Sequence, residues 1–237
     1  MSDTTENGIV VLLSGGLDSS VLLHHLRREA GTKTLIHALG IHYGQRHARE
    51  LDAARYQADA ARAQFHEIDL WVLGAMLQPG STLIAGAAAV PDLDSIPEAA
   101  RNQPPTYVPN RNMMLLSIAA AFAEAQDTFQ VYYGAQAQDE YGYWDCTREF
   151  LQRINAVLAL NRKEPVQIHA PFVDWSKADI VQRGQALGVD FAHTWSCYRG
   201  ESKPCGECPT CVERANAFAA CGVRDPLQAS CSPGMTP

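Results

Sequence analysis

The stretch from Ile9 to Gly31 reads IVVLLSGGLDSSVLLHHLRREAG and decides the fold. Its first five residues, 9–13, are apolar and favour a buried strand, whereas residues 17–28 form an amphipathic run typical of a helix that Gly31 would end. Small residues join the two elements. Because the first N–H groups of a helix have no partner inside it, a strand–turn–helix unit of this kind is suited to binding an anion.

The alternation of strand and helix continues outward from this unit. We predict further strands at 34–41, 64–69, 129–136 and 165–169, and further helices at 46–63, 111–126, 147–160 and 176–187. This order predicts an α/β fold, a doubly wound and mostly parallel sheet with helices on both faces, similar to a Rossmann fold. Residues 78–110 are rich in proline and break the pattern, which is typical of a loop with a function of its own.

The composition is that of a globular protein. The chain has 237 residues, of which 46% are hydrophobic and 19% charged, and this suits one large domain with a small addition. The net charge of −7 argues against a broad nucleic-acid-binding surface, and no apolar stretch has the length of a membrane span or signal peptide. We therefore expect a cytoplasmic protein that binds neither membranes nor nucleic acid directly.

The turn SGGLDS, residues 14–19, carries groups that bind phosphate. Its two glycines let the backbone approach a phosphate closely, and the serines at 14, 19 and 20 add hydroxyl donors. Asp18 adds a carboxylate that can hold a divalent cation. The sequence has no Gly-Lys-Ser/Thr in this turn and no G-x-G-x-x-G, which excludes the common nucleotide and dinucleotide loops. An ordinary helix cap is the structural alternative.

A cysteine cluster follows near the other end of the sequence. Cys197, Cys205, Cys208 and Cys211 have the spacing C-x7-C-x2-C-x2-C, which lets four thiolates converge on one tetrahedral zinc ion. An iron–sulfur cluster is the second possibility. The other cysteines, at 146, 221 and 231, are interpreted as plain thiols. A cysteine ribbon alone is also compatible with a non-catalytic binding module, so this alternative stays open.

Together the two motifs resemble the 7-cyano-7-deazaguanine synthase (QueC) family of ATP pyrophosphatases. Four further blocks agree in order: YGQRH at 43–47, VPNRN at 108–112, DEYGYWDCTREF at 139–150 and APFVDWSKADI at 170–180. The resemblance implies a nucleotide α-hydrolase-like domain over 1–192 and a four-cysteine zinc segment over 193–222. We expect residues 223–237 to be a tail that is frayed over 226–237.

The resemblance also implies a reaction. ATP adenylates 7-carboxy-7-deazaguanine, ammonia displaces AMP to give an amide, and a second adenylation leads to the nitrile. The implied cofactors are ATP, Mg2+ and Zn2+, and the implied assembly is a homodimer. A carboxylate is a poor acyl donor until its oxygen becomes a good leaving group, which explains why the leaving pyrophosphate needs a cradle of positive charge.

The matching motifs assign residues to these roles. The implied ATP site consists of Leu13, Ser14, Gly15, Gly16, Leu17, Asp18, Ser19, Ser20, Tyr43, Gln45 and Arg46. Catalytic roles fall to Asp18, Arg111 and Lys177, because arginine offers a bidentate fork and lysine a point charge to phosphate or carboxylate. The deazaguanine is implied to bind Asp139, Tyr143, Asp145 and Arg111, with acids accepting from its N–H edge and tyrosine stacking on its ring.

Departures from the family pattern define a second candidate function. Glu140, Tyr141 and Trp144 replace residues usual in the block that we assign to the deazaguanine. A relative with a changed pocket could stop at the amide, or could join the activated acid to another amine, including a protein amine as in bacterial defence systems.

Overall fold

All five strands belong to one parallel sheet. The structure is a computed structural model and describes residues 8–46, 49–100, 103–137 and 143–229. The strands are β1 (Ile9–Leu12), β2 (Ile36–His42), β3 (Gln64–Asp69), β4 (Gln130–Tyr132) and β5 (Gln167–His169). Their order is β3-β2-β1-β4-β5, and every neighbouring pair is parallel. The predicted doubly wound α/β fold is confirmed.

Helices connect the strands, and several short helical turns lie in the loops. The α-helices are α1 (Leu17–Ala30), α2 (Arg49–Ala60), α3 (Leu73–Leu77), α4 (Arg111–Ala125), α5 (Arg148–Leu158), α6 (Lys177–Leu187), α7 (Pro209–Ala220) and α8 (Pro226–Ala229). The 3-10 turns are η1 (Gln78–Gly80), η2 (Leu93–Ser95), η3 (Glu98–Ala100), η4 (Trp144–Cys146) and η5 (Phe191–His193).

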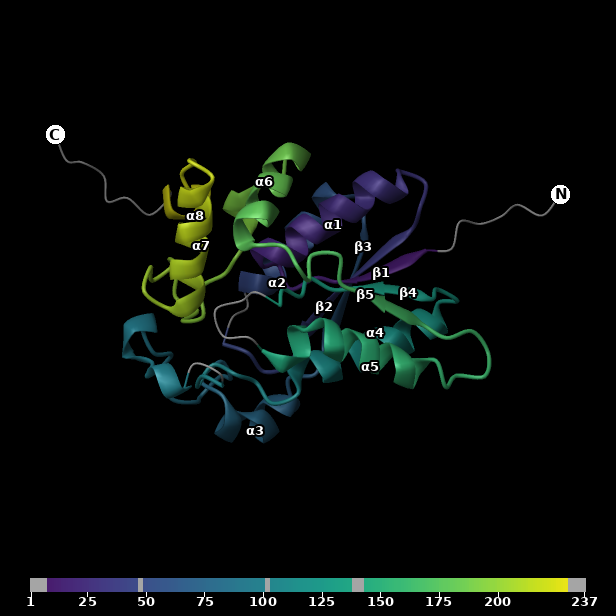
Figure 1. Cartoon of the computed structure of the whole chain (residues 1–237), viewed down its shortest axis with the longest axis horizontal. Coiled ribbons are helices and arrows are strands. Elements are labelled where there is room, and N and C mark those ends of the chain that lie inside the picture. Colours follow the sequence, from purple (N-terminus) through teal and green to yellow (C-terminus); the bar gives the residue numbers. More distant parts are fainter. Residues whose placement is uncertain (1–7, 47–48, 101–102, 138–142, 230–237) are drawn as a thin grey trace.

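Both faces of the sheet are covered, which explains the unbroken apolar run of β1. Val11 packs in a core with α1, α2 and α6, whereas Val10 packs in a second core with α4 and α5, and both side chains are fully buried. Figure 1 shows α1 and α6 on one side of the strands and α4 and α5 on the other. Successive side chains of a strand point to opposite faces, so a strand between two helical layers must be apolar throughout.

The order of the strands fixes where a ligand can bind. The chain moves outward from β1 through β2 to β3 and then returns to the other side of β1, where β4 pairs with it. The loops after β1 and β4 therefore leave the sheet in opposite directions and open a crevice between them. The SGGLDS turn follows β1 directly and lies at this crevice.

The segment that follows α3 is irregular, as predicted, yet it has a core. Leu83, Ile84, Val90 and Val108 are buried together with the cysteines of the C-terminal segment. Arg46 ties this segment down, since its guanidinium donates hydrogen bonds to the carbonyl oxygens of Thr82, Ala87 and Ala88.

A buried ion pair fastens α7 to the residues after it. Arg214 donates to both carboxylate oxygens of Asp225 at 2.8 and 2.9 Å, and the two residues are 3% and 4% exposed. Leu227 of α8 is also buried. The interpretation of residues 226–229 as part of a frayed tail is therefore wrong, because this segment forms a helix and packs against the protein.

Replacement of Asp225 by asparagine is expected to destabilise the protein by about 3–5 kcal/mol, because it leaves the Arg214 charge buried without its counter-ion. Denaturant unfolding measures the loss. The matched control is Asp94→Asn on the exposed η2 turn, which should leave the unfolding midpoint unchanged. Equal unfolding midpoints for the two variants would contradict the role of Asp225 as the buried counter-ion of Arg214.

Candidate active site and metal centre

A cavity of about 270 Å³ opens at the carboxyl ends of β1, β2 and β4. Its floor is apolar and includes Leu12, Leu39, Ile41 and Leu115. Polar groups reach it from the SGGLDS turn, the loops after β2 and β4, the first residues of α4 and α6, and the cysteine-rich segment. Elements far apart in the sequence thus converge on one concave site, the usual geometry of a ligand pocket.

The turn after β1 is held open by its own side chains. The Ser14 and Ser19 hydroxyls lie 3.0 Å apart, and Ser14 Oγ also accepts from the N–H of Gly16 at 3.2 Å. Gly15 has φ of 80°, and a Cβ there would lie 2.1 Å from the carbonyl oxygen of Glu50. Only glycine fits this approach between the turn and α2, so the backbone can present the first amides of α1 to the cavity.

Most of the predicted phosphate-binding residues face the cavity. Those that line it are Leu13, Ser14, Gly16, Leu17, Asp18 and Ser19. Gly15 and Ser20 lie behind this surface. The carbonyl oxygen of Gly15 accepts from the N–H of Trp195 at 2.9 Å, and Ser20 is fully buried. Gly15 and Ser20 therefore support the turn from behind and do not line the cavity.

Lys177 and Asp18 meet across the cavity although 159 positions separate them. Lys177 is the first residue of α6, which a capping box of Ser176 and Asp179 starts. Its ammonium lies 2.8 Å from a carboxylate oxygen of Asp18 and 3.5 Å from one of Glu213. Sequence reasoning missed Glu213, since only the packing of α7 against α6 brings this side chain to Lys177.

Arg111 begins α4, after Asn110 in a left-handed conformation. Burial opposes its charge, but Tyr43, Tyr198, Cys146 and Asp145 surround it and raise its pKa overall. Its guanidinium therefore stays a cation in the cavity wall, where it can bind an anionic group.

Asp145 lies behind Arg111. It is 3% exposed and accepts a hydrogen bond from the N–H of Asn112 at 3.2 Å, and it lines a small pocket next to the main cavity. Tyr143 lines both pockets, and its hydroxyl lies 3.3 Å from that of Thr106. The structure thus brings Tyr143 to the main cavity and places Asp145 under the start of α4. Asp139, the other acid predicted for this pocket, lies outside the described residues.

The loop after β2 contributes Tyr43 and Gln45 to the cavity wall, and Glu50 reaches the wall from the first turn of α2. The Gln45 amide is internal to the loop, since it accepts from the Tyr43 N–H at 2.8 Å and donates to the Ile41 carbonyl at 3.2 Å. Arg46 is not brought to the cavity, because the carbonyl groups of residues 82, 87 and 88 hold its guanidinium.

Glu50 was missed by sequence reasoning. Desolvation raises the pKa of its carboxyl group to about 7, although the charge of Arg111 acts in the opposite direction. Only the folded position of α2 shows this, as the residue follows the YGQRH block in the sequence without any distinguishing pattern.

Two buried polar atoms at the end of β4 have no partner among the described residues. They are the hydroxyl of Tyr133 and the amide oxygen of Gln136, whose residues are 4% and 3% exposed and line the cavity. The nitrogen of the Gln136 amide donates to the Trp175 carbonyl at 3.0 Å, which fixes the orientation of the group. An unsatisfied buried polar group costs about 1–3 kcal/mol, so these atoms are suited to a ligand.

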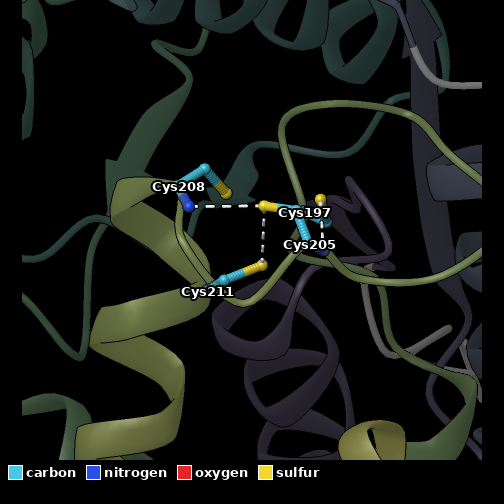
Figure 2. A group of neighbouring side chains, drawn as sticks. All are labelled: Cys197, Cys205, Cys208 and Cys211. Atoms are coloured by element: carbon cyan, nitrogen blue, oxygen red, sulfur yellow. Dashed lines mark hydrogen bonds between the residues drawn. The ribbon is translucent and has the colours of Figure 1, made fainter. Parts of the chain in front are cut away.

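The four predicted cysteines come together as the spacing indicates. Their sulfur atoms all lie within 4.8 Å of one another, and Cys197, Cys208 and Cys211 are buried (Figure 2). Hydrogen bonds among these thiols lower the pKa of Cys208 and raise the pKa of Cys197 and Cys211, so one thiolate, at Cys208, is stabilised by its two neighbours. This geometry is that of a metal site.

The cysteine segment also forms one wall of the cavity. Trp195, Ser196, Tyr198 and Thr210 line it, and the Thr210 hydroxyl donates to the Ser196 carbonyl at 2.6 Å. The four cysteines therefore lie directly behind a wall that faces the SGGLDS turn.

Comparisons with known proteins agree over almost the whole chain. The family model described as queuosine biosynthesis protein QueC matches residues 8–222. The 7-cyano-7-deazaguanine synthase of Marinobacter nauticus is 43% identical over 224 residues, which cover 93% of this chain and 96% of the relative. The 7-cyano-7-deazaguanine synthase of Archaeoglobus fulgidus is 43% identical over 219 residues, which cover 92% of this chain and 88% of the relative.

Among solved structures, an NMN synthetase from Francisella tularensis superposes with a TM-score of 0.49 and 12% identity, covering 98% of this chain and 89% of the synthetase chain.

No helix in the described part of the chain is long and apolar enough to cross a membrane.

Proposed function

Since this chain belongs to the QueC family, we propose that it is a 7-cyano-7-deazaguanine synthase, which uses ATP and ammonia to convert 7-carboxy-7-deazaguanine to the nitrile. The observation that supports this most is the cavity where the SGGLDS turn, Arg111 and the Asp18–Lys177 pair converge. The curated relatives carry the synthase name, and the comparisons give no support to the amide-forming, conjugating or non-catalytic alternatives.

In this proposal the phosphates of ATP bind at the turn 14–19. The first amides of α1 and the hydroxyls of Ser14 and Ser19 donate to the phosphate oxygens, and Lys177 adds a positive charge from the opposite side. The Asp18 carboxylate lines the cavity beside these amides and fits Mg2+, which prefers oxygen ligands. Bound there, Mg2+ would neutralise charge on the leaving pyrophosphate.

The deazaguanine acid binds on the β4 side of the cavity. A guanine-like ring presents N–H donors along one edge, and the Gln136 amide oxygen and the Tyr133 hydroxyl are groups without a partner among the described residues and are able to accept them. Tyr143 supplies an aromatic face in the same wall, and Asp145 positions Arg111 and the start of α4 from behind. Arg111 is then placed for the substrate carboxylate or the α-phosphate.

We assign zinc to the cysteine cluster. Zn–S bonds of about 2.3 Å place the sulfurs of a tetrahedral site roughly 3.8 Å apart, which agrees with four sulfurs within 4.8 Å. An iron–sulfur cluster would spread its thiolates over several irons and needs wider spacing. The proposal also includes ammonia as the nitrogen donor and a homodimeric assembly, both supported by the family resemblance. It includes no nucleic-acid binding, which the net charge of −7 supports.

A product assay tests the function. The protein is incubated with 7-carboxy-7-deazaguanine, ATP, Mg2+ and ammonium, and mass spectrometry follows the acid, amide and nitrile together with AMP and pyrophosphate. We expect nitrile with release of AMP and pyrophosphate. A reaction that ends at the amide, or ATP that is never cleaved in the presence of the acid, would contradict the proposal.

The Tyr133→Phe variant tests the substrate pocket. Removing a hydroxyl that has no partner among the described residues should leave the melting temperature unchanged or slightly higher, whereas loss of a hydrogen bond to the ring should raise KM for the acid about 10-fold. Steady-state kinetics measure both substrates, and KM for ATP should not change.

The neighbouring Tyr132 provides the matched control, since it packs against the core on the opposite face of the sheet. Tyr132→Phe should leave KM for the acid unchanged. If the two variants have the same KM for the acid, the hydroxyl of Tyr133 does not contact the substrate.

A further inference from the structure

Amide formation needs a base, and the cavity offers few. The nitrogen of ammonia attacks the adenylated carboxyl carbon, the bond from that carbon to the AMP oxygen breaks with its electron pair, and the nitrogen must lose one proton. No histidine is among the described residues that line the cavity. The carboxylates there are Asp18, Glu50 and Glu213.

Two of these carboxylates are poor bases in their positions. Lys177 lies 2.8 Å from Asp18 and 3.5 Å from Glu213, and a nearby ammonium stabilises the ionised form of a carboxylate. Asp18 is also the residue that fits Mg2+ in the proposed ATP site.

Glu50 has a different environment. It belongs to the first turn of α2 and lines the cavity next to apolar Leu51. The charge of Arg111 lowers the pKa of its carboxyl group, but desolvation is the larger effect and raises it. The carbonyl group of the same residue lies against Gly15, which places Glu50 beside the turn that holds the phosphates. The titratable and charged groups that share the cavity wall with it are Arg111, Tyr43, Tyr133, Tyr143, Tyr198, Cys146, Lys177, Arg214, Asp18 and Glu213.

We propose that the Glu50 carboxylate takes the proton from the attacking nitrogen in the amine step, an inference that rests on the proposed synthase function. The nitrogen–carbon bond forms, AMP leaves with the electron pair of the broken bond, and the proton passes to Glu50 and from there to solvent. The raised pKa of this group suits the role, because a base is most effective when its pKa is near the working pH.

Measuring adenylation and the amine step separately distinguishes a base at Glu50 from a residue that only binds ATP or the acid. Adenylation has a carboxylate as its nucleophile and needs no base, so acid-dependent exchange of labelled pyrophosphate into ATP measures it without ammonia. In the Glu50→Gln variant we expect exchange to stay within about 3-fold of wild type, while amide and nitrile formation falls roughly 10²–10⁴-fold. Glu164→Gln at an exposed position is the control and should change neither rate.

The pH dependence gives a second readout. A base works in its deprotonated form, so the ratio of the wild-type to the Glu50→Gln amine rate should rise with pH through about 7 and then level off. The ratio cancels the titration of ammonia itself. If the glutamine variant fails to fold, Glu50→Asp carries the test, with slower amide formation, near-normal exchange and a retained pH inflection.

The outcomes are distinguishable. Equal loss of exchange and amide formation in Glu50→Gln would mean that Glu50 binds ATP or the acid, and wild-type amide formation would mean that it takes no part; either result overturns the inference. A wild-type protein without exchange or nitrile formation would instead overturn the proposed function.

Discussion

Asp18→Asn is expected to lower AMP release by roughly 10²–10³-fold, because it removes a charge from the proposed ATP site, at the point where the leaving pyrophosphate would bind. The carboxylate of Asp18 lines the cavity at the second residue of α1 and lies 2.8 Å from the Lys177 ammonium. Asparagine has nearly the same shape, but it binds Mg2+ more weakly and leaves Lys177 without the closer of its two carboxylates. Acid-dependent AMP formation, measured by chromatography, reports the effect.

The fold should tolerate this change, since Asp18 is not part of an apolar core. Asp59→Asn on the exposed surface of α2 is the control and should keep full activity. A melting temperature close to that of wild type, together with lost AMP release, supports the assignment. Normal AMP release by Asp18→Asn would remove Asp18 from the ATP site.

Cys208→Ser should cost the protein its metal and several kcal/mol of stability, since binding to a structural zinc site is worth on the order of 10 kcal/mol to the folded state. Cys208 is fully buried, and its sulfur belongs to a set of four within 4.8 Å. A hydroxyl is a weaker zinc ligand than a thiolate. Elemental analysis of the purified protein and thermal unfolding measure the two losses.

The Cys221→Ser variant tests whether the loss of metal and stability is specific to the four-cysteine cluster. The Cys221 thiol donates to the Ala178 carbonyl at 3.4 Å, and a serine hydroxyl can keep that bond. We expect this variant to hold its metal and to unfold at the wild-type temperature. Unchanged metal content in Cys208→Ser would exclude the four-cysteine site.

The elements that depend on neighbouring residues in the chain were predictable. The β1–turn–α1 unit has its apolar run, its glycines and its helix in one stretch of 23 residues, and the observed elements end within two residues of the predicted limits. The same holds for the cysteines, because two C-x2-C steps bring three sulfurs together before any tertiary contact forms.

The remaining parts of the site depend on packing between distant elements. Glu213 approaches Lys177 only because α7 lies against α6, and Glu50 becomes a weaker acid only once the cavity shields it from water. Arg46 is a residue that the sequence motif assigns to the site but whose side chain the fold directs elsewhere. Its YGQRH block resembles the family, but the fold places a loop with accepting carbonyl groups beside its guanidinium, and the ATP contact implied for it stays a prediction.

The bond between the Trp195 N–H and the Gly15 carbonyl has a consequence for biosynthesis. A ribosome releases the phosphate turn and all five strands before it releases the wall formed by residues 195–214. Until that wall packs against the turn, the cavity of the nascent protein is open on one side. Closure of the cavity on this side is thus left to a part of the chain that is synthesised after the whole sheet.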